Sequence, residues 1–350
     1  MDVYKKIFNA NMGEFYDINH YDKIIKENCI GFKEDGQVLF CCIKDAIPKE
    51  DRDKYKDVIR KPAKAKTKNR GQSAGAVDIK YFPKRAVVLC DKNGNEFKDN
   101  KKRFSVFYKD EKGKVVNRCQ SNQVRCGVAG HFDKVAGFPC RKVGWSRDNL
   151  DKHNILGELA NEIQKNHKEF CYTSYLYHKI IADKRPAYLF KDSIYSTMTL
   201  NYDFRTATHK DTGDLHGGLS TLTIFEDEIN NYEGFYLGLP DYKIAFDLRD
   251  GDLLIFDAHE KHANTEYKVL SDKLPIDDIT KTNFAGRIAV VCYLRNRLKE
   301  CPIEIPKDDR FKSKKQKIAE KNKAILLSQI NLLLLMKLVP KIQLEHTHSS

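Results

Sequence analysis

The chain has 350 residues, of which 41% are hydrophobic, and carries a formal net charge of +13 at pH 7. A chain of this length can bury a sizeable core, so one elaborated domain or two are expected, and a fibre or a disordered tail is excluded. The positive charge fits either a polyanionic partner or a generally lysine-rich composition. Two basic runs, at 60–70 and 307–323, concentrate that charge. Such runs can bind phosphate, serve as a localisation signal or simply be solvated segments.

The cysteine content and the first residues indicate an intracellular protein. Ten cysteines are too sparse for a disulfide scaffold, and no apolar run follows the first methionine. We therefore expect reduced thiols and a cytoplasmic or nuclear location, without stable membrane association. Four possible zinc ligands share one short region: Cys119, Cys126, His131 and Cys140. They lack a CxxC pair, so ordinary thiols are favoured and a structural zinc stays open.

The first part of the chain predicts a mixture of helices and strands. Residues 1–145 hold short alternating runs such as GQVLFCCI and RAVVLC, separated by turns rich in Lys, Gly and Asn. Apolar residues then recur at helical spacing in 148–170 and again in 171–184, which predicts two amphipathic helices. Pro186 closes the second of them.

The pattern changes period after these helices. Short β-branched and aromatic runs, separated by Gly, Pro and Asp, predict roughly eight strands between residues 190 and 298. Such a unit closes most economically as a double-stranded β-helix, or jelly roll. The predicted class is therefore α+β, with a jelly-roll core, flanking helices and an N-terminal α+β extension. Three parts are expected: an extension with its basic segment (1–64), the main domain (65–300) and a C-terminal tail (301–350).

The C-terminal tail contains a long apolar stretch. The run AILLSQINLLLLMKLV is interrupted by Ser328, Gln329, Asn331 and Lys337, and is short for a membrane span. We interpret it as a helix that docks against the body of the protein or against a protein partner, including a second copy in a dimer.

A histidine and an aspartate at 209 and 211 supply the first chemical signal. On an extended strand, residues two apart point to the same side, so His209 and Asp211 can bind one metal ion. A second histidine on a neighbouring jelly-roll strand would complete a 2-His-1-carboxylate set for iron(II), which leaves positions open for a co-substrate and oxygen. The run FDAHEKH offers two candidates, His259 and His262, and an odd spacing allows only one of them to reach the metal.

Arg287 and Asn201 are candidates for binding an acidic co-substrate. Arg287 begins a strongly apolar strand, where a charge is costly without a partner. Its two-pronged guanidinium suits the distal carboxylate of 2-oxoglutarate, whereas capping of a strand end in solvent is the alternative. Asn201 either faces the pocket, to bind co-substrate or base, or holds a turn.

These residues occur in an order that resembles a known family. STMTLNYDFRTATHKDTGD (196–214), the region 232–266 and GRIAVVCYLR (286–295) look like the iron(II)- and 2-oxoglutarate-dependent dioxygenases, specifically the TET/JBP-like branch that hydroxylates bases in nucleic acid. NRGQSAGAVD (69–78) and the region 124–145 extend the resemblance. It covers about residues 65–298 and leaves the two ends of the chain outside.

The resemblance implies a role for each candidate. His209, Asp211 and His262 match the metal ligands, and Arg287 matches the arginine that binds 2-oxoglutarate; His259 is left as a neighbour of the site. The family uses Fe(II), 2-oxoglutarate and O2, with ascorbate as an optional reductant. Two departures are visible: the segment 268–283 lengthens the approach to Arg287, and Ala289 stands where many members have serine.

The implied reaction is hydroxylation of the methyl group of 5-methylcytosine or thymine in DNA or another nucleic acid, with release of succinate and CO2. A hydroxylase of prolyl or lysyl side chains, or of a small molecule, is the alternative, because substrate choice lies in loops on a shared barrel. A nucleic-acid-binding jelly roll that has lost catalysis is a third reading, although the metal ligands are complete.

Overall fold

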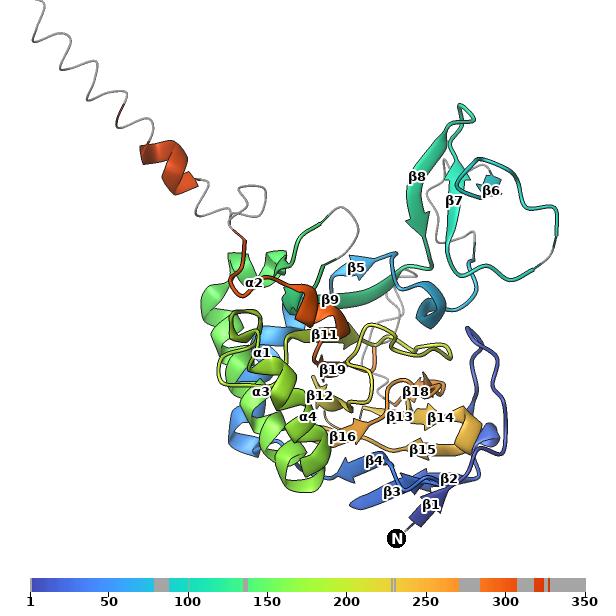
Figure 1. Ribbon diagram of the computed structural model, residues 1–350. Coiled ribbons are helices and arrows are strands. Elements are labelled where there is room, and N and C mark those ends of the chain that lie inside the picture. The colour runs from blue at the N-terminus through green and yellow to red at the C-terminus, as the bar shows by residue number, and fades with distance from the viewer. Residues whose placement is uncertain are drawn as a thin grey trace, which may run out of the picture.

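The computed structural model describes residues 2–78, 88–99, 101–134, 138–227, 229, 231–270, 284–306, 318–323 and 327, and only the backbone of 117–120. Within these ranges the protein is α+β, as predicted. Helices cover one face of a large sheet and a smaller sheet lies against its other face (Figure 1).

The large sheet has ten strands. Nine of them follow the order β1-β3-β4-β16-β12-β19-β11-β9-β10, and β5 pairs with β9. The bounds are Asp2–Tyr4 (β1), Cys29–Lys33 (β3), Val38–Ile43 (β4), Lys66–Thr67 (β5), Val124–Phe132 (β9), Arg141–Lys142 (β10), Thr197–Tyr202 (β11), Ser220–Glu226 (β12), Leu253–Phe256 (β16) and Arg287–Tyr293 (β19).

Three smaller sheets complete the β-structure of the described residues. The four-stranded sheet, β17-β14-β15-β2, faces the large sheet across an apolar core. The others are the pair β13-β18 and the sheet β6-β7-β8, which stands out from the body in Figure 1. Their bounds are Lys23–Ile25 (β2), Val88–Cys90 (β6), Val106–Lys109 (β7), Val115–Gln120 (β8), Tyr232–Gly234 (β13), Leu237–Leu239 (β14), Ile244–Phe246 (β15), Ala263–Asn264 (β17) and Tyr267–Val269 (β18).

Two helices, α3 (Leu150–Phe170) and α4 (Tyr172–Ala182), match the two predicted amphipathic segments. The other helices of the described residues are α1 (Lys49–Ala63) and α2 (Gly144–Asp148), with short 3-10 turns at Ile18–His20 (η1), Gly71–Ala74 (η2), Pro186–Tyr188 (η4), Pro240–Tyr242 (η5) and Asn296–Glu300 (η6). Helix α1 was not predicted. It takes in the start of the basic run 60–70, where Pro62 and Ala63 are buried against the body.

The alternation of strand residues explains the two cores. In β16, Leu253 and Ile255 pack toward the helices, whereas Leu254 and Phe256 pack toward the small sheet. Strand β19 alternates in the same way, so both strands are buried on both faces and read as continuous apolar runs. Nine strands lie between residues 190 and 298 in the described part of the chain, close to the number predicted.

A disulfide corrects the prediction that all thiols are reduced. Cys140 and Cys301 are bonded, although 161 positions separate them, because the turn η6 brings Cys301 into the apolar cluster that holds Cys140. Bonded sulfur cannot bind metal, so the group Cys119, Cys126, His131 and Cys140 is not a zinc site as written. Among residues whose side chains are described, the one cluster of three possible metal ligands lies elsewhere.

The C-terminal segment remains a prediction. The expected docking helix lies outside the described residues except for Leu327, as does much of the basic run that precedes it. The described helices include none with the length and apolar character needed to cross a bilayer. Dimerisation through the tail likewise stays untested.

Buried histidines in α3 and α4 predict a pH-dependent stability. Burial lowers the pKa of His178 to about 4, against about 6.5 in an unfolded chain. Between these values the unfolded chain binds a proton that the folded chain does not, so the free energy of unfolding should fall on acidification, by about 3 kcal/mol for this group. Urea unfolding from about pH 7 to about pH 4 measures the slope. His178→Gln should flatten it, and exposed His216→Gln should not; equal slopes in all three proteins would contradict the assignment.

Candidate active site

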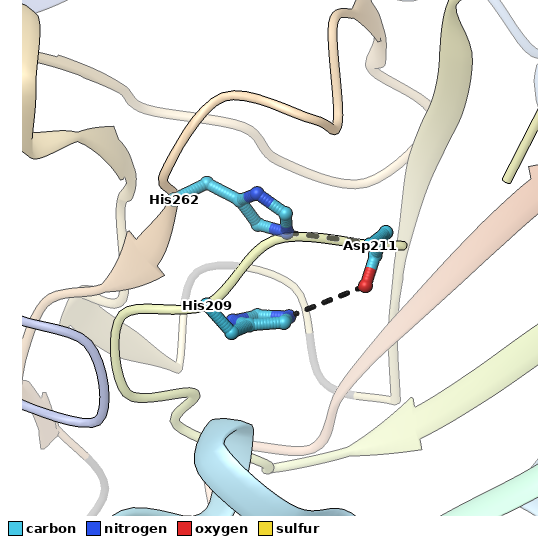
Figure 2. A group of neighbouring side chains, drawn as sticks. All are labelled: His209, Asp211 and His262. Atoms are coloured by element: carbon cyan, nitrogen blue, oxygen red, sulfur yellow. Dashed lines mark ion pairs between the residues drawn. The ribbon is translucent and has the colours of Figure 1, made fainter. Parts of the chain in front are cut away.

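Two histidines and an aspartate meet at the end of the apolar core. His209 follows β11 and His262 precedes β17, and their backbones form an isolated antiparallel bridge in which each amide donates to the other's carbonyl at 3.0 Å. The amide of Asp211 donates to the carbonyl of Ala258 at 2.9 Å, which turns its carboxylate toward both rings. Figure 2 shows the three side chains converging from these two segments.

The distances between the side chains fit a shared cation. Asp211 Oδ1 lies 3.6 Å from His209 Nε2, and Asp211 Oδ2 lies 3.7 Å from His262 Nε2. One ligand atom from each residue falls within 4.8 Å of the others. Among the residues described, no other group of three offers this arrangement.

Backbone carbonyls orient both rings. His209 Nδ1 lies 2.8 Å from the carbonyl oxygen of Ala207, and His262 Nδ1 lies 2.9 Å from that of Glu260. A carbonyl only accepts, so each Nδ1 carries the proton and donates it. In the neutral ring this leaves the lone pair on Nε2, and both Nε2 atoms face Asp211.

The pKa values of the three groups follow from burial and mutual contact. Burial, with the neighbouring His262, lowers the pKa of His209 to about 4. Burial alone would raise the pKa of Asp211, but its contacts with the two histidines lower it to about 2. Burial opposes a charge on His262 as well, yet Asp211 raises its pKa above the usual value. At neutral pH the aspartate is therefore a carboxylate and His209 is neutral, which are the forms that bind metal.

A cavity of about 400 Å3 opens beside this cluster. Its walls combine apolar residues from both sheets with polar residues from the loops. The lining includes Arg70, Gln72, Ser73, Thr199, Asn201, Phe204, Thr206, Lys210, Asp214, Leu222, Leu237, Phe256, Asn264, Arg287, Ala289, Val291, Tyr293 and Arg295, together with the three cluster residues.

Arg287 lies in the cavity wall rather than in solvent. It is only 2% exposed, its guanidinium stacks 4.6 Å from the ring of Phe235, and its Nε and Nη2 have no hydrogen-bond partner. The carboxylate of Asp203 accepts hydrogen bonds from the backbone amides of Gly286 and Arg287, which holds the start of β19 in place. Burial lowers the pKa of Arg287. A buried guanidinium with unused donors is a site for an anion.

Asn201 and His259 differ in their relation to the cavity. Asn201 lies in β11 on the cavity wall, and its side-chain oxygen is buried without a hydrogen-bond partner. His259 is not part of the cluster of possible metal ligands. Its Nδ1 lies 3.4 Å from a carboxylate oxygen of Asp257, and its ring packs 4.8 Å from that of His216.

Two further arginines of the cavity were not singled out from the sequence. Arg70 precedes η2, and its buried Nε lacks a partner. Arg295 follows β19, and its Nε donates to the hydroxyl of Thr197 at 3.0 Å. Arg70 lies in the run NRGQSAGAVD, whose resemblance to the family could have pointed to a place in the site. However, 139 positions separate Arg70 from His209, and no local pattern in the sequence links the two residues.

A family model matches the part of the chain that carries this cluster. Residues 137–296 match Tet_JBP, the oxygenase domain of the 2OGFeDO superfamily. This part of the chain is therefore similar to the oxygenase domain of the Tet/JBP family.

Curated relatives agree over a similar length. The bifunctional helicase and thymine dioxygenase JBP2 of Trypanosoma brucei brucei is 32% identical over 192 residues, which are 53% of this chain and 16% of that protein. The thymine dioxygenase JBP1-B of Trypanosoma cruzi is 30% identical over 186 residues, 50% of this chain and 20% of that protein. The chain thus spans a small part of these relatives' length.

A solved structure, NgTET1 in complex with 5mC DNA, covers 86% of this chain and 90% of its own, with 16% sequence identity and a TM-score of 0.40.

Proposed function

We propose that the protein is an Fe(II)- and 2-oxoglutarate-dependent dioxygenase that hydroxylates the methyl group of a pyrimidine base in DNA or another nucleic acid. One observation carries the proposal: three metal-ligand side chains and a buried arginine with unused donors line the same cavity. The match of residues 137–296 to an oxygenase family model and the names of the curated relatives support it.

We also propose that the facing sheets between about residues 190 and 298 are a double-stranded β-helix. The site supports this, because His209 and His262 lie at the open end of the core between the two sheets. We keep the main domain at residues 65–300, flanked by the extension 1–64 and the tail 301–350. Strand β4 of the extension pairs with β16, so the extension would fold together with the main domain.

The residues fit the metal and the co-substrate that the family implies. Two imidazole nitrogens and one carboxylate oxygen are the donor set of non-haem iron(II) oxygenases. His209, Asp211 and His262 would hold the iron. Arg287 would bind the distal carboxylate of 2-oxoglutarate through its unpaired Nε and Nη2, and Asn201 would bind the co-substrate or the base through its unpaired oxygen.

The protein's own residues would prepare the reaction. Bound iron, with 2-oxoglutarate and O2, supplies an oxidant for an unactivated C–H bond, with succinate and CO2 as coproducts. Leu222, Leu237 and Phe256 give the inner wall of the cavity an apolar surface, which would keep water away from such an oxidant and limit side reactions. The carbonyls of Ala207 and Glu260 hold the metal-binding nitrogens of both histidines in one direction.

A base in duplex DNA would have to leave the stack to reach the cavity. Phe204, Phe256 and Tyr293 are the described aromatic residues that line the cavity, and each could contact such a base. Tyr202 instead packs in the core and donates to Asp227 at 3.2 Å. The net charge of +13 favours a polyanionic substrate, and the relatives' names make thymine the first base to test.

The proposal predicts iron-dependent oxidation of DNA. We expect the protein with Fe(II), 2-oxoglutarate and ascorbate to convert thymine or 5-methylcytosine in duplex DNA to the hydroxymethyl base, measured by mass spectrometry of nucleosides, with stoichiometric succinate. His209→Ala should abolish both products. If succinate forms only with a peptide or a small molecule, the substrate is not a nucleic acid and the alternative hydroxylase function would be favoured. If the protein binds DNA but forms no succinate with any substrate, it would be a nucleic-acid-binding protein and not an enzyme.

A further inference from the structure

The first residues of the chain run along the edge of the proposed metal site. Between β1 and η1, residues 7–16, which we call the N-terminal strap, loop past η5 toward the β6-β7-β8 sheet (Figure 1, dark blue). The strap is anchored at Asp241, whose carbonyl accepts from the amides of Ile7 and Phe8 and whose carboxylate accepts from that of Ala10 at 2.7 Å. The family model does not reach this segment, and the sequence resemblance left it outside.

The strap is hydrogen-bonded to the residue before the first histidine. The amide of Gly13 donates to the carbonyl of Thr208 at 2.7 Å, and the amide of Thr208 donates to the carbonyl of Glu14 at 2.8 Å. Thr208 is completely buried. The extended segment 208–209 therefore has the strap on one side and His262 on the other.

The strap is also tied to the residue before the second histidine. Lys261 Nζ donates to Asn9 Oδ1 at 2.5 Å and to the carbonyl of Ala10 at 2.8 Å, and pairs with Asp241 at 3.4 Å. The lysine side chain is only 14% exposed, so these bonds are largely shielded from water. Three unlike groups share one ammonium, which uses all three of its donors.

These contacts form a closed circuit. The strap holds Thr208, His209 is bridged to His262, and Lys261 returns to the strap. We infer that the N-terminal strap is a positioning element that fixes the spacing of the two metal-binding histidines. Because metal affinity depends on ligand spacing, loss of such supporting contacts typically weakens binding about 10- to 100-fold. The inference rests on the proposed function, since it presumes that the histidines bind metal.

Two substitutions test the strap, one for each of its two sets of contacts. Lys261→Met removes the lysine contacts and keeps the apolar stem. In Gly13→Ala, the added Cβ would lie 2.1 Å from the ring of Phe104, and the backbone there has φ of +77°. Matched controls are Lys54→Met, which removes a lysine that pairs with two carboxylates away from the strap, and Gly36→Ala, where φ is +81° and the Cβ meets nothing within 4 Å.

Cobalt(II) serves as the probe, because its visible absorption reports coordination without turnover. We expect Lys261→Met and Gly13→Ala to bind cobalt about 10- to 100-fold more weakly than the wild type, and both controls to bind like it. Thermal unfolding of all five proteins identifies a variant that fails to fold. If both folded strap variants bind cobalt with the affinity of the wild type, the inference about the strap is wrong, but the proposed metal site is not affected. No cobalt binding by the wild type would overturn the proposed function.

Hydrogen exchange gives a second readout that needs no variant. If the strap and the metal site are coupled, metal must stabilise the strap as much as the strap favours metal. We expect cobalt to slow exchange of the amides of Gly13 and Thr208. Exchange of the amide of Gly94, which donates to the carbonyl of Asp91 in a turn outside the strap, should stay unchanged. Unchanged exchange at Gly13 and Thr208 in a cobalt-loaded protein would contradict the inference even if Gly13→Ala does not fold.

Discussion

Arg287→Met is expected to raise the KM for 2-oxoglutarate about 100-fold, or roughly 3 kcal/mol of binding free energy. The guanidinium is almost completely buried, and its Nε and Nη2 have no partner within the protein. A carboxylate that reaches these donors would gain a charge-assisted pair shielded from water. Succinate release measured over a range of 2-oxoglutarate concentrations tests this, and the KM for DNA should change little.

The same substitution should not destabilise the fold. A buried cation with unused donors costs free energy, and an apolar side chain of similar length removes that cost. We therefore expect the Tm of Arg287→Met to equal or exceed that of the wild type, so that lost affinity cannot be attributed to unfolding. Arg287→Lys keeps the charge without the two-pronged geometry and should have an intermediate KM. An unchanged KM in both variants would move the co-substrate to another cation, such as Arg70.

The parts of the fold that the sequence predicts are those with a regular local period. The apolar residues of helix α3 recur about every 3.6 positions, and strand β19 is a nearly continuous apolar run. The sequence predicted the bounds of both elements to within a few residues. His209 and Asp211 were recognised because a spacing of two on an extended segment has one geometric meaning. Such features depend on neighbours in sequence alone.

The features that the sequence missed depend on contacts between distant residues. Cys140 and Cys301 bond across 161 positions, and Lys261 reaches Asn9 across 252. Strand β2 joins β15 in the small sheet although the N-terminal extension was separated from the core. No period or motif in a single sequence reports such pairs, because either partner alone looks like an ordinary residue.

The choice between the two histidines of FDAHEKH predicts the largest effect on metal binding. His262→Ala removes a ligand whose Nε2 faces Asp211, so iron content and succinate formation should fall by more than the 10- to 100-fold that loss of a supporting contact costs. His259→Ala removes a ring that contacts Asp257 and His216, so iron content should remain close to that of the wild type. Iron per chain after anaerobic loading and desalting measures both.

The comparison is decisive because the two histidines are three residues apart and differ mainly in direction. Both lie beside a carboxylate, at 3.7 Å for His262, which is buried, and 3.4 Å for His259, which is half-buried. Only His262 is bridged to His209 and has its Nδ1 bonded to a carbonyl, which commits the opposite nitrogen to the cluster. If His259→Ala lost iron while His262→Ala retained it, the ligand set would have to be rebuilt around Asp257, and the bridge between the two segments would serve structure alone.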